Sequence, residues 1–113
     1  MNEMAVSDYK GVFIFAQQVD NKITGVSYEL IGKAKDLAKD LDTQVTAVLL
    51  GYKVGDLCDK LARYGADKVI VVDDPALEVY STEPYVHAMH QVILAKNPEV
   101  VLYGATAIGR DMA

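Results

Sequence analysis

Residues Val100 to Ala113 read VVLYGATAIGRDMA and are the most informative segment of the chain. Val100 to Tyr103 are apolar without polar alternation, which is typical of a strand buried in a parallel sheet. The small residues after it allow a tight turn, and Thr106 can cap a helix whose first N–H groups favour an anionic neighbour. Because the sequence stops before that helix completes two turns, we expect the chain to be part of a longer polypeptide.

Apolar runs and helical periodicity alternate along the rest of the chain. Strands are predicted at residues 11–16, 45–50 and 68–72, and helices at residues 27–41, 55–64 and 82–96. Ser27 is the predicted N-cap of the first helix, and residues 17–25 are interpreted as a loop with room for a small hairpin. Alternation of strands with helices predicts parallel pairing through right-handed crossovers. We therefore expect one α/β domain, a doubly wound parallel sheet, over residues 1–113.

Composition limits the classes of protein to which the chain can belong. Its 113 residues, 51% of them hydrophobic, suffice for one small core and exclude general disorder. No apolar run approaches the roughly 20 residues of a membrane helix, and no leader with a cleavage site opens the chain. The single cysteine, Cys58, fits a reducing compartment, so a cytoplasmic location is expected. A net charge of −5 argues against nucleic-acid binding.

Several segments of the chain follow a known family in the same order. Gly104 to Asp111, GATAIGRD, resembles the Gly-Ala-Thr/Ser-x-x-Gly-Arg/Lys-Asp/Asn segment that closes the fourth strand in the amino-terminal domain of the electron transfer flavoprotein alpha subunit. Upstream, the agreement continues in DYKGV (8–12), VSYELIGKA (26–34), YGADKV (64–69) and DDPALEVY (73–80). The resemblance implies an adenine-nucleotide-hydrolase-like domain with strand order 3-2-1-4, incomplete at its carboxyl end.

The resemblance also implies a function. Members of the family are heterodimers of alpha and beta subunits that pass electrons between flavins and an acyl-CoA dehydrogenase. Their shuttling FAD is held mainly by a second alpha-subunit domain, which would lie beyond Ala113, so this fragment is not expected to bind FAD tightly. The run from Asp73 to Tyr80 and the Gly-Arg-Asp triplet resemble the anaerobic bacterial branch. Some members there carry a second flavin in the beta subunit and bifurcate electrons from NADH to ferredoxin and an enoyl-CoA; whether this chain does so stays open.

In a sheet of this order, ligands bind in the crevice between the carboxyl ends of the first and fourth strands. The loops expected to line it are residues 17–20 and 104–110, and the candidate cofactor contacts are Gly104, Ala105, Thr106, Gly109 and Arg110. Small residues would let a ligand approach the backbone, and Arg110 adds a planar charged donor. In a bifurcating member, Thr106 and Arg110 would approach the beta-subunit flavin and stabilise its reduced anion. The alternative is that the small residues only permit tight strand–helix packing, with Arg110 in a local ion pair.

Sequence signatures of other nucleotide sites are missing from the chain. It has no Gly-x-Gly-x-x-Gly fingerprint, no Gly-x4-Gly-Lys-Ser/Thr loop and no Ser-Gly-Gly-x-Asp-Ser loop of adenylating enzymes. No nucleophile–base arrangement is visible either, so no catalytic residue is assigned and an enzyme activity stays undecided. Two competing interpretations are kept: an ATP-binding regulatory domain similar to universal stress proteins, which shares the layer order, and a structural domain without a ligand.

The remaining reactive residue types are interpreted as structural. His87 and His90, three residues apart on one predicted helix, share a face but lack the further ligands that a metal needs, so no metal site is predicted. Cys58 is expected on a buried stripe, and the adjacent Asp73 and Asp74 are expected to build a turn. The tyrosines fit a subunit interface and core-edge packing about equally well; those considered are Tyr9, Tyr28, Tyr80 and Tyr85.

Overall fold

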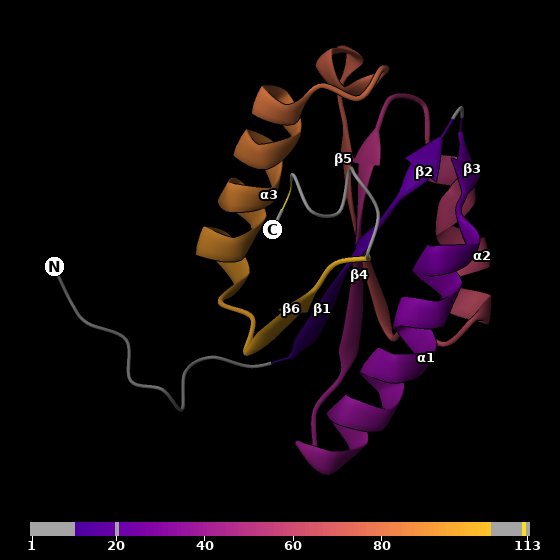
Figure 1. The fold of residues 1–113 in the computed structure, drawn as a ribbon, viewed down its shortest axis with the longest axis vertical. Coiled ribbons are helices and arrows are strands. Elements are labelled where there is room, and N and C mark those ends of the chain that lie inside the picture. Colours follow the sequence, from indigo (N-terminus) through magenta and orange to yellow (C-terminus); the bar gives the residue numbers. More distant parts are fainter. Residues whose placement is uncertain (1–10, 20, 105–111, 113) are drawn as a thin grey trace, which may run out of the picture.

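The computed structural model describes residues 11–19, 21–104 and 112. Strands and helices alternate along these residues (Figure 1). In chain order the elements are β1 (Val12–Ala16), β2 (Gln18–Val19), β3 (Lys22–Ile23), α1 (Gly25–Asp40), β4 (Val45–Gly51), the 3-10 turn η2 (Gly55–Leu57), α2 (Cys58–Arg63), β5 (Lys68–Asp73), the 3-10 turn η3 (Pro75–Leu77), α3 (Thr82–Lys96) and β6 (Val100–Leu102).

Four of these strands form one parallel sheet in the order β5-β4-β1-β6. Val12 of β1 pairs with Val45 of β4 on one side and with Val100 of β6 on the other. Every residue of β1 and β4 is buried, which explains why both strands are continuous apolar runs. The predicted order 3-2-1-4 and the doubly wound α/β class are therefore confirmed.

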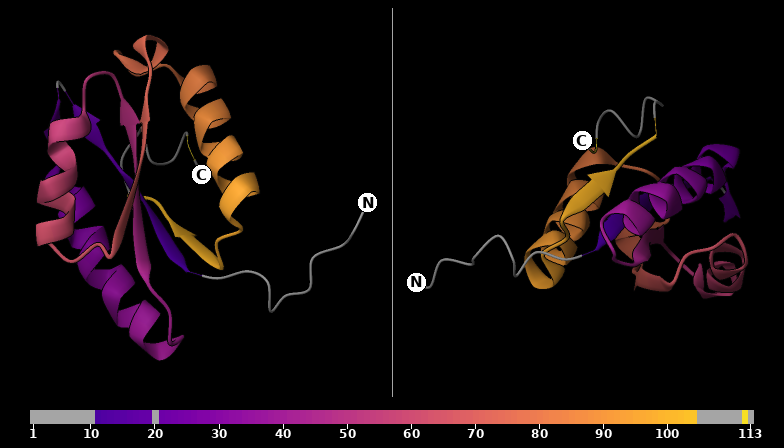
Figure 2. Two further views of the ribbon diagram at one scale, coloured as in Figure 1. Left: turned by 180° about the vertical axis from the view of Figure 1, so that it is seen from behind. Right: turned by 90° about the horizontal axis from the view of Figure 1, so that it is seen from below.

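Helices cover both faces of the sheet. α1 and α2 lie on one face and α3 lies on the other (Figures 1 and 2). Because neighbouring residues of a strand point to opposite faces, Ile14 enters the core under α1 and α2, whereas Phe13 and Phe15 enter the core under α3.

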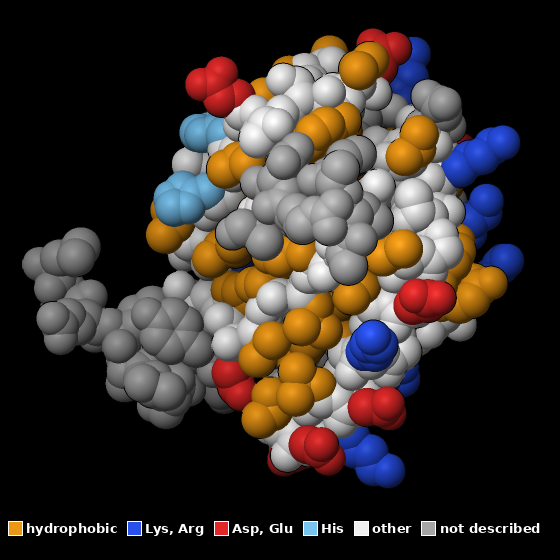
Figure 3. Space-filling model, viewed as in Figure 1, with side chains coloured by type: hydrophobic (Ala, Val, Ile, Leu, Met, Phe, Trp, Pro, Cys, Tyr) orange, Lys and Arg blue, Asp and Glu red, His pale blue; other side chains and the backbone are white. Residues whose placement is uncertain are grey.

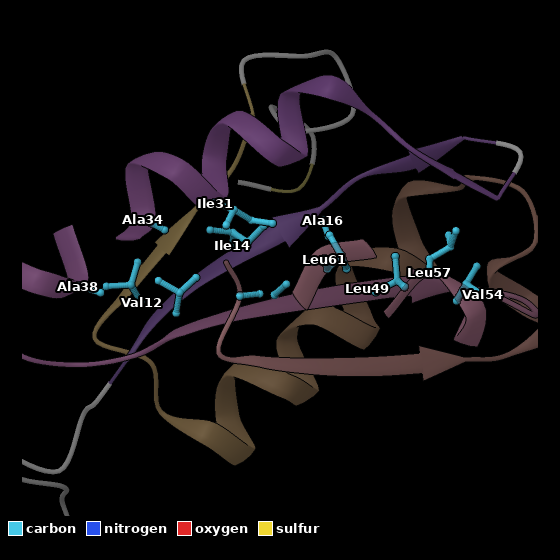
Figure 4. Close-up of a cluster of buried hydrophobic side chains, with 13 residues drawn as sticks. Val12, Ile14, Ala16, Ile31, Ala34, Ala38, Leu49, Val54, Leu57 and Leu61 are labelled. Carbon is cyan, nitrogen blue, oxygen red and sulfur yellow. The ribbon is translucent and has the colours of Figure 1, made fainter. Parts of the chain in front are cut away.

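The two cores differ in composition. The core under α1 and α2 is aliphatic, and Figure 4 shows Ile31 and Ala34 of α1 beside Ile14 of β1. The core under α3 contains aromatic and sulfur-bearing side chains, namely Phe13, Phe15, Tyr85, Met89 and Met112. Each large side chain that is fully buried contributes about 1.5–3 kcal/mol. The sheet is thus a stable platform for the loops at its carboxyl edge.

The start of α1 differs from the prediction. The helix begins at Gly25 with Thr24 at the N-cap, so the assignment of Ser27 as N-cap is wrong. Ser27 is fully buried, and its hydroxyl turns to the backbone of Gln17, which precedes the antiparallel pair of β2 and β3. A small hairpin does form in the predicted loop, and its contact with the helix decides where the Ser27 hydroxyl points.

Two other helices follow their sequence signals more closely. α3 covers the predicted residues 82–96 and ends where Asn97 adopts a left-handed conformation with φ of 50°. The helix predicted at 55–64 is shorter, because residues Gly55–Leu57 form a 3-10 turn and α2 begins only at Cys58. Glycine at the start of this segment disfavours a regular helical turn.

Candidate functional site

The carboxyl ends of β1 and β6 are neighbours, as the predicted crevice requires. Ile14 of β1 pairs with Leu102 of β6. The chain then leaves β1 at Gln17 and leaves β6 toward Gly104. Of the five predicted cofactor contacts, Gly104 is described; Ala105, Thr106, Gly109 and Arg110 lie outside the described residues.

Gly104 is buried against the first turn of α1. A Cβ atom at this position would overlap the Cγ1 atom of Val26. This contact explains why glycine is needed here, and it agrees with the tight strand–helix packing that was kept as the alternative. A contact between this segment and a cofactor stays a prediction.

The loop after β1 is fixed to the start of α1 by hydrogen bonds around Gln17. The Gln17 N–H donates to Ser27 Oγ at 2.7 Å, and the Ser27 hydroxyl donates to the Gln17 carbonyl at 2.9 Å. The same carbonyl accepts from the Thr24 N–H at 3.0 Å and from Thr24 Oγ1 at 3.2 Å. The Gln17 backbone, just after the carboxyl end of β1, is therefore already hydrogen-bonded within the protein.

Gln18 joins the hairpin to the other face of the sheet. Its Nε2 atom donates to the Leu50 carbonyl at 3.3 Å and lies 3.4 Å from the Tyr85 hydroxyl. Its Oε1 atom accepts from the Asn21 N–H at 3.0 Å. The Tyr85 hydroxyl in turn donates to the Leu77 carbonyl at 2.6 Å. This Gln18–Tyr85 network connects β2, β4, η3 and α3 across the carboxyl edge of the sheet.

Burial of the Tyr85 phenol favours its protonated form. Burial raises the pKa of Tyr85, the hydrogen bond from Gln18 lowers it, and nearby Tyr80 raises it. Sequence reasoning missed this network, since Gln18 and Tyr85 are 67 residues apart. The only local signal was an amphipathic tyrosine in the first turns of a helix, which fits either a core or an interface.

The four tyrosines considered from the sequence have different surroundings. Tyr85 is only 4% exposed and is a core residue, and Tyr80 packs edge-on against it with ring centroids 5.0 Å apart. Tyr28 is half-buried and stacks on Tyr64 at 3.8 Å. Core-edge packing is confirmed for Tyr80 and Tyr85, an interface role for Tyr28 stays a prediction, and Tyr9 lies outside the described residues.

The two adjacent aspartates build turns, as predicted. Asp73 accepts from the Lys53 N–H at 2.8 Å and from the Val54 N–H at 3.2 Å. Asp74 caps η3 by accepting from the Ala76 N–H at 2.8 Å. Both carboxylates are thus engaged by backbone N–H groups of the turns after β4 and β5.

The histidines and the cysteine offer no metal centre. His87 and His90 are exposed on α3 (Figure 3), and within residues 11–19, 21–104 and 112 no group of three His, Cys, Asp or Glu side chains is placed to hold an ion. Cys58 is half-buried rather than fully buried. Burial raises the pKa of its thiol and Asp59 raises it further, so the reactive thiolate is disfavoured.

In the described part of the chain, no helix combines the length and apolar character needed to cross a bilayer.

A parallel sheet with helices on both faces, in which the carboxyl ends of β1 and β6 lie side by side, defines a doubly wound α/β domain. The sequence matches the electron transfer flavoprotein domain family over residues 12–113, and the chain belongs to that family. The match runs through every strand and helix described above.

Curated relatives carry names from the same family. The electron transfer flavoprotein subunit alpha of Thermoanaerobacterium thermosaccharolyticum is 45% identical over 108 residues, which cover 96% of this chain and 33% of that protein. The acryloyl-CoA reductase electron transfer subunit beta of Anaerotignum propionicum is 36% identical over 98% of this chain and 30% of its own length. The lactate dehydrogenase (NAD(+),ferredoxin) subunit LctC of Acetobacterium woodii is 37% identical over 93% of this chain and 25% of its own length. The chain thus spans a third or less of these relatives.

Proposed function

We propose that this chain is the amino-terminal domain of an electron transfer flavoprotein alpha subunit, which works in a heterodimer with a beta subunit. The observation that carries the proposal is the family match over residues 12–113, which includes the whole sheet and both of its helical layers. The names of the relatives support electron transfer as the activity of the complete protein.

The domain acts in this proposal as a rigid partner surface, and FAD is held mainly by other segments of the protein. Three observations support this division. The backbone N–H and carbonyl groups of Gln17 are already hydrogen-bonded to Ser27 and Thr24. The Val26 side chain occupies the space beside Gly104, so this glycine does not leave an open cradle for a ligand. Every buried side-chain polar atom of the described residues already has a hydrogen-bond partner. None of these atoms therefore needs a partner from a flavin. The described residues therefore do not fit a tight flavin site.

A titration tests this division of labour. The chain of residues 1–113 and the complete alpha–beta complex would each be titrated with FAD, with circular dichroism used to verify that the short chain is folded. We expect tight binding only by the complex. A submicromolar dissociation constant for the folded short chain would contradict the proposal.

The loop after β6 is proposed to approach a flavin of the beta subunit. Gly104 lies at the carboxyl edge where ligands of doubly wound sheets bind, and Ala105, Thr106, Gly109 and Arg110 come after it in the sequence. A positive charge from Arg110 near the flavin would stabilise its reduced, anionic form. Arg110→Ala in the complete heterodimer is expected to lower the reduction potential of that flavin or its reactivity with NADH, whereas Lys33→Ala on the exposed side of α1 should leave both unchanged.

The reaction partners are proposed from the family and its relatives. An acyl-CoA dehydrogenase is the proposed partner of the complete protein, and NADH and ferredoxin are the further partners if it bifurcates electrons. The relatives from Anaerotignum propionicum and Acetobacterium woodii favour an acyl-CoA or ferredoxin-linked reaction by their names. Reduction of the purified complex by NADH, followed with and without ferredoxin, distinguishes bifurcation from simple transfer: only a bifurcating complex requires ferredoxin for turnover. The cytoplasm is the proposed location.

A further inference from the structure

The topology leaves one side of the sheet incompletely covered. α3 connects β5 at one edge to β6 at the other, so it must cross the two middle strands, and it packs against β4. Figure 2 shows α3 on one side of the sheet, with α1 and α2 on the other. As a result Ile70 and Val72 of the edge strand β5 are only half-buried, although their side chains point to the face that α3 covers.

A groove lies between β5 and α3 on this face. One hollow of about 510 Å³ has an almost entirely apolar lining, which includes Ile70, Val72, Leu77, Ala88, Val92 and Ala95. A second hollow of about 640 Å³ at the amino ends of the strands shares Ile70 and Lys96 with the first. The two hollows together are called the β5–α3 groove.

Charge is distributed unevenly along the β5–α3 groove. Asp74 lies at the end where β5 stops, whereas Lys68 and Lys96 both border the hollow at the opposite end. Both lysines are exposed, and within the described part of the chain neither has an ion-pair partner. Two lysines without an ion-pair partner among the described residues, in a chain of net charge −5, favour an acidic group at this end of the groove, where Thr43, Gln44 and Thr46 make the lining partly polar.

We propose that the β5–α3 groove binds an amphipathic helix of a partner protein, with the acidic carboxyl-terminal turn of that helix between Lys68 and Lys96. A parallel sheet requires helices over both faces, and a helix beside α3 completes the layer over β5. The wall from Pro84 to Lys96 spans about 18 Å at 1.5 Å per residue, so it accommodates about three turns. The negative end of the helix dipole adds to the attraction of the lysines.

A second copy of the chain could not dock its α3 in this orientation without bringing lysine against lysine, because α3 ends in Lys96. The small side chains of Ala88 and Ala95 on the wall instead allow a partner helix to approach closely. The inference does not depend on flavin binding and goes beyond the proposed function.

Photo-crosslinking in the full-length protein tests this inference. Benzoylphenylalanine would replace Gln91, an exposed residue that lines the groove, and in the control it would replace Lys33, which is exposed on α1 on the opposite face. After irradiation in cells, the crosslinked peptide would be sequenced by mass spectrometry. We expect position 91 to yield a segment of another polypeptide with helical apolar periodicity and acidic residues in its last turn, and position 33 not to yield it.

A charge reversal gives the second readout. Lys68→Glu combined with Lys96→Glu should reduce the crosslinking yield about tenfold, which corresponds to about 1.4 kcal/mol. The matched pair Lys33→Glu and Lys39→Glu on α1 should change the yield less than about twofold, since those exposed charges do not face the groove. Thermal unfolding of both variants verifies that they fold, and binding of the synthetic crosslinked peptide to the purified protein gives the same comparison without cells.

Several results would overturn the inference. These are a crosslink from position 91 only to a second copy or to another part of the same polypeptide, a captured segment without acidic residues, or a yield no higher than at position 33. An unchanged yield or peptide affinity after reversal of both groove lysines would overturn it as well.

Discussion

The Tyr85 hydroxyl donates a 2.6 Å hydrogen bond to the Leu77 carbonyl, and this contact ties the first turns of α3 to the 3-10 turn after β5. The phenol is buried at the carboxyl edge of the sheet and also meets the Gln18 amide at 3.4 Å. The Tyr85 phenol therefore joins the hairpin after β1 to the connection after β5 at the carboxyl edge of the sheet.

Removing this hydroxyl is expected to destabilise the domain. Tyr85→Phe leaves the Leu77 carbonyl without its donor in a buried site, which costs about 1–3 kcal/mol. The free energy of unfolding from urea titration measures the effect. Tyr64→Phe is the matched control, because Tyr64 is 58% exposed and the phenylalanine ring can keep the stacking on Tyr28. Equal stability of Tyr85→Phe and the parent protein would show that the network carries no net energy.

The Ser27 hydroxyl is expected to hold the hairpin on α1. Ser27→Ala leaves the Gln17 N–H without its acceptor, and we expect the free energy of unfolding to fall by about 1–3 kcal/mol. Hydrogen exchange at the Gln17 and Thr24 amides should accelerate more than exchange in β4. Ser81→Ala provides the control, because Ser81 is exposed and makes no side-chain cap bond at α3. Unchanged exchange at Gln17 would mean that the hairpin is held by other contacts.

Gly104 allows a test of packing against ligand binding. Gly104→Ala forces a Cβ into Val26 and is expected to cost about 1–3 kcal/mol of stability. Adding Val26→Ala should recover much of that loss, since it removes the overlapping methyl group. Gly32→Ala on α1 is the control; its Cβ would meet nothing within 4 Å, and it should stabilise the helix by about 0.5–1 kcal/mol.

A different pattern would contradict the packing explanation of Gly104. If the glycine serves chiefly a cofactor, Gly104→Ala should leave the unfolding free energy intact. Flavin affinity of the complete complex should then fall, and Val26→Ala should not restore it.

Stability is expected to fall in alkali because of the buried Tyr85 and the half-buried Tyr103. Burial raises the pKa of both Tyr85 and Tyr103 above the ordinary value of 10.0, so the folded state holds its phenolic protons more tightly than the unfolded chain. This contribution is complete below the unfolded pKa and disappears as the pH rises through the folded pKa. The unfolding free energy should therefore decline above about pH 10. Tyr103→Phe should make the unfolding free energy decline less steeply with pH. An unchanged slope would mean that other groups cause the decline.

The sequence, with the family resemblance, predicted the strands and their order well, but it predicted poorly the side-chain contacts between distant elements. β1 and β4 are apolar runs because central parallel strands are buried on both faces, whereas the edge strand β5 is apolar but only half-buried. Asn97 ends α3 through a local conformational preference. Ser27 was misassigned because a hydroxyl near a helix start is a local capping signal, whereas its real partner, Gln17, is supplied by the hairpin. Local sequence preferences therefore predict which secondary structure forms, but not which distant residue a side chain contacts.

The crevice could be predicted from the sequence, whereas the groove could not. The family resemblance placed β1 beside β6 and so predicted the crevice. That the Val26 side chain packs against Gly104 could be learned only from the structure. The β5–α3 groove forms because α3 crosses two strands between β5 and β6. The sequence of no single segment indicates this arrangement. The Gln18–Tyr85 network likewise joins residues that only the folded sheet brings together.

The central claim is that this domain serves a flavin-containing heterodimer without holding the shuttling flavin itself. Native mass spectrometry of the full-length protein, purified with its bound chains and cofactors, tests that claim most directly. We predict a yellow complex with one second subunit and FAD that stays with the complex when residues 1–113 are removed as a separately folded piece. A colourless homodimer that binds ATP, or FAD that leaves with residues 1–113, would contradict it.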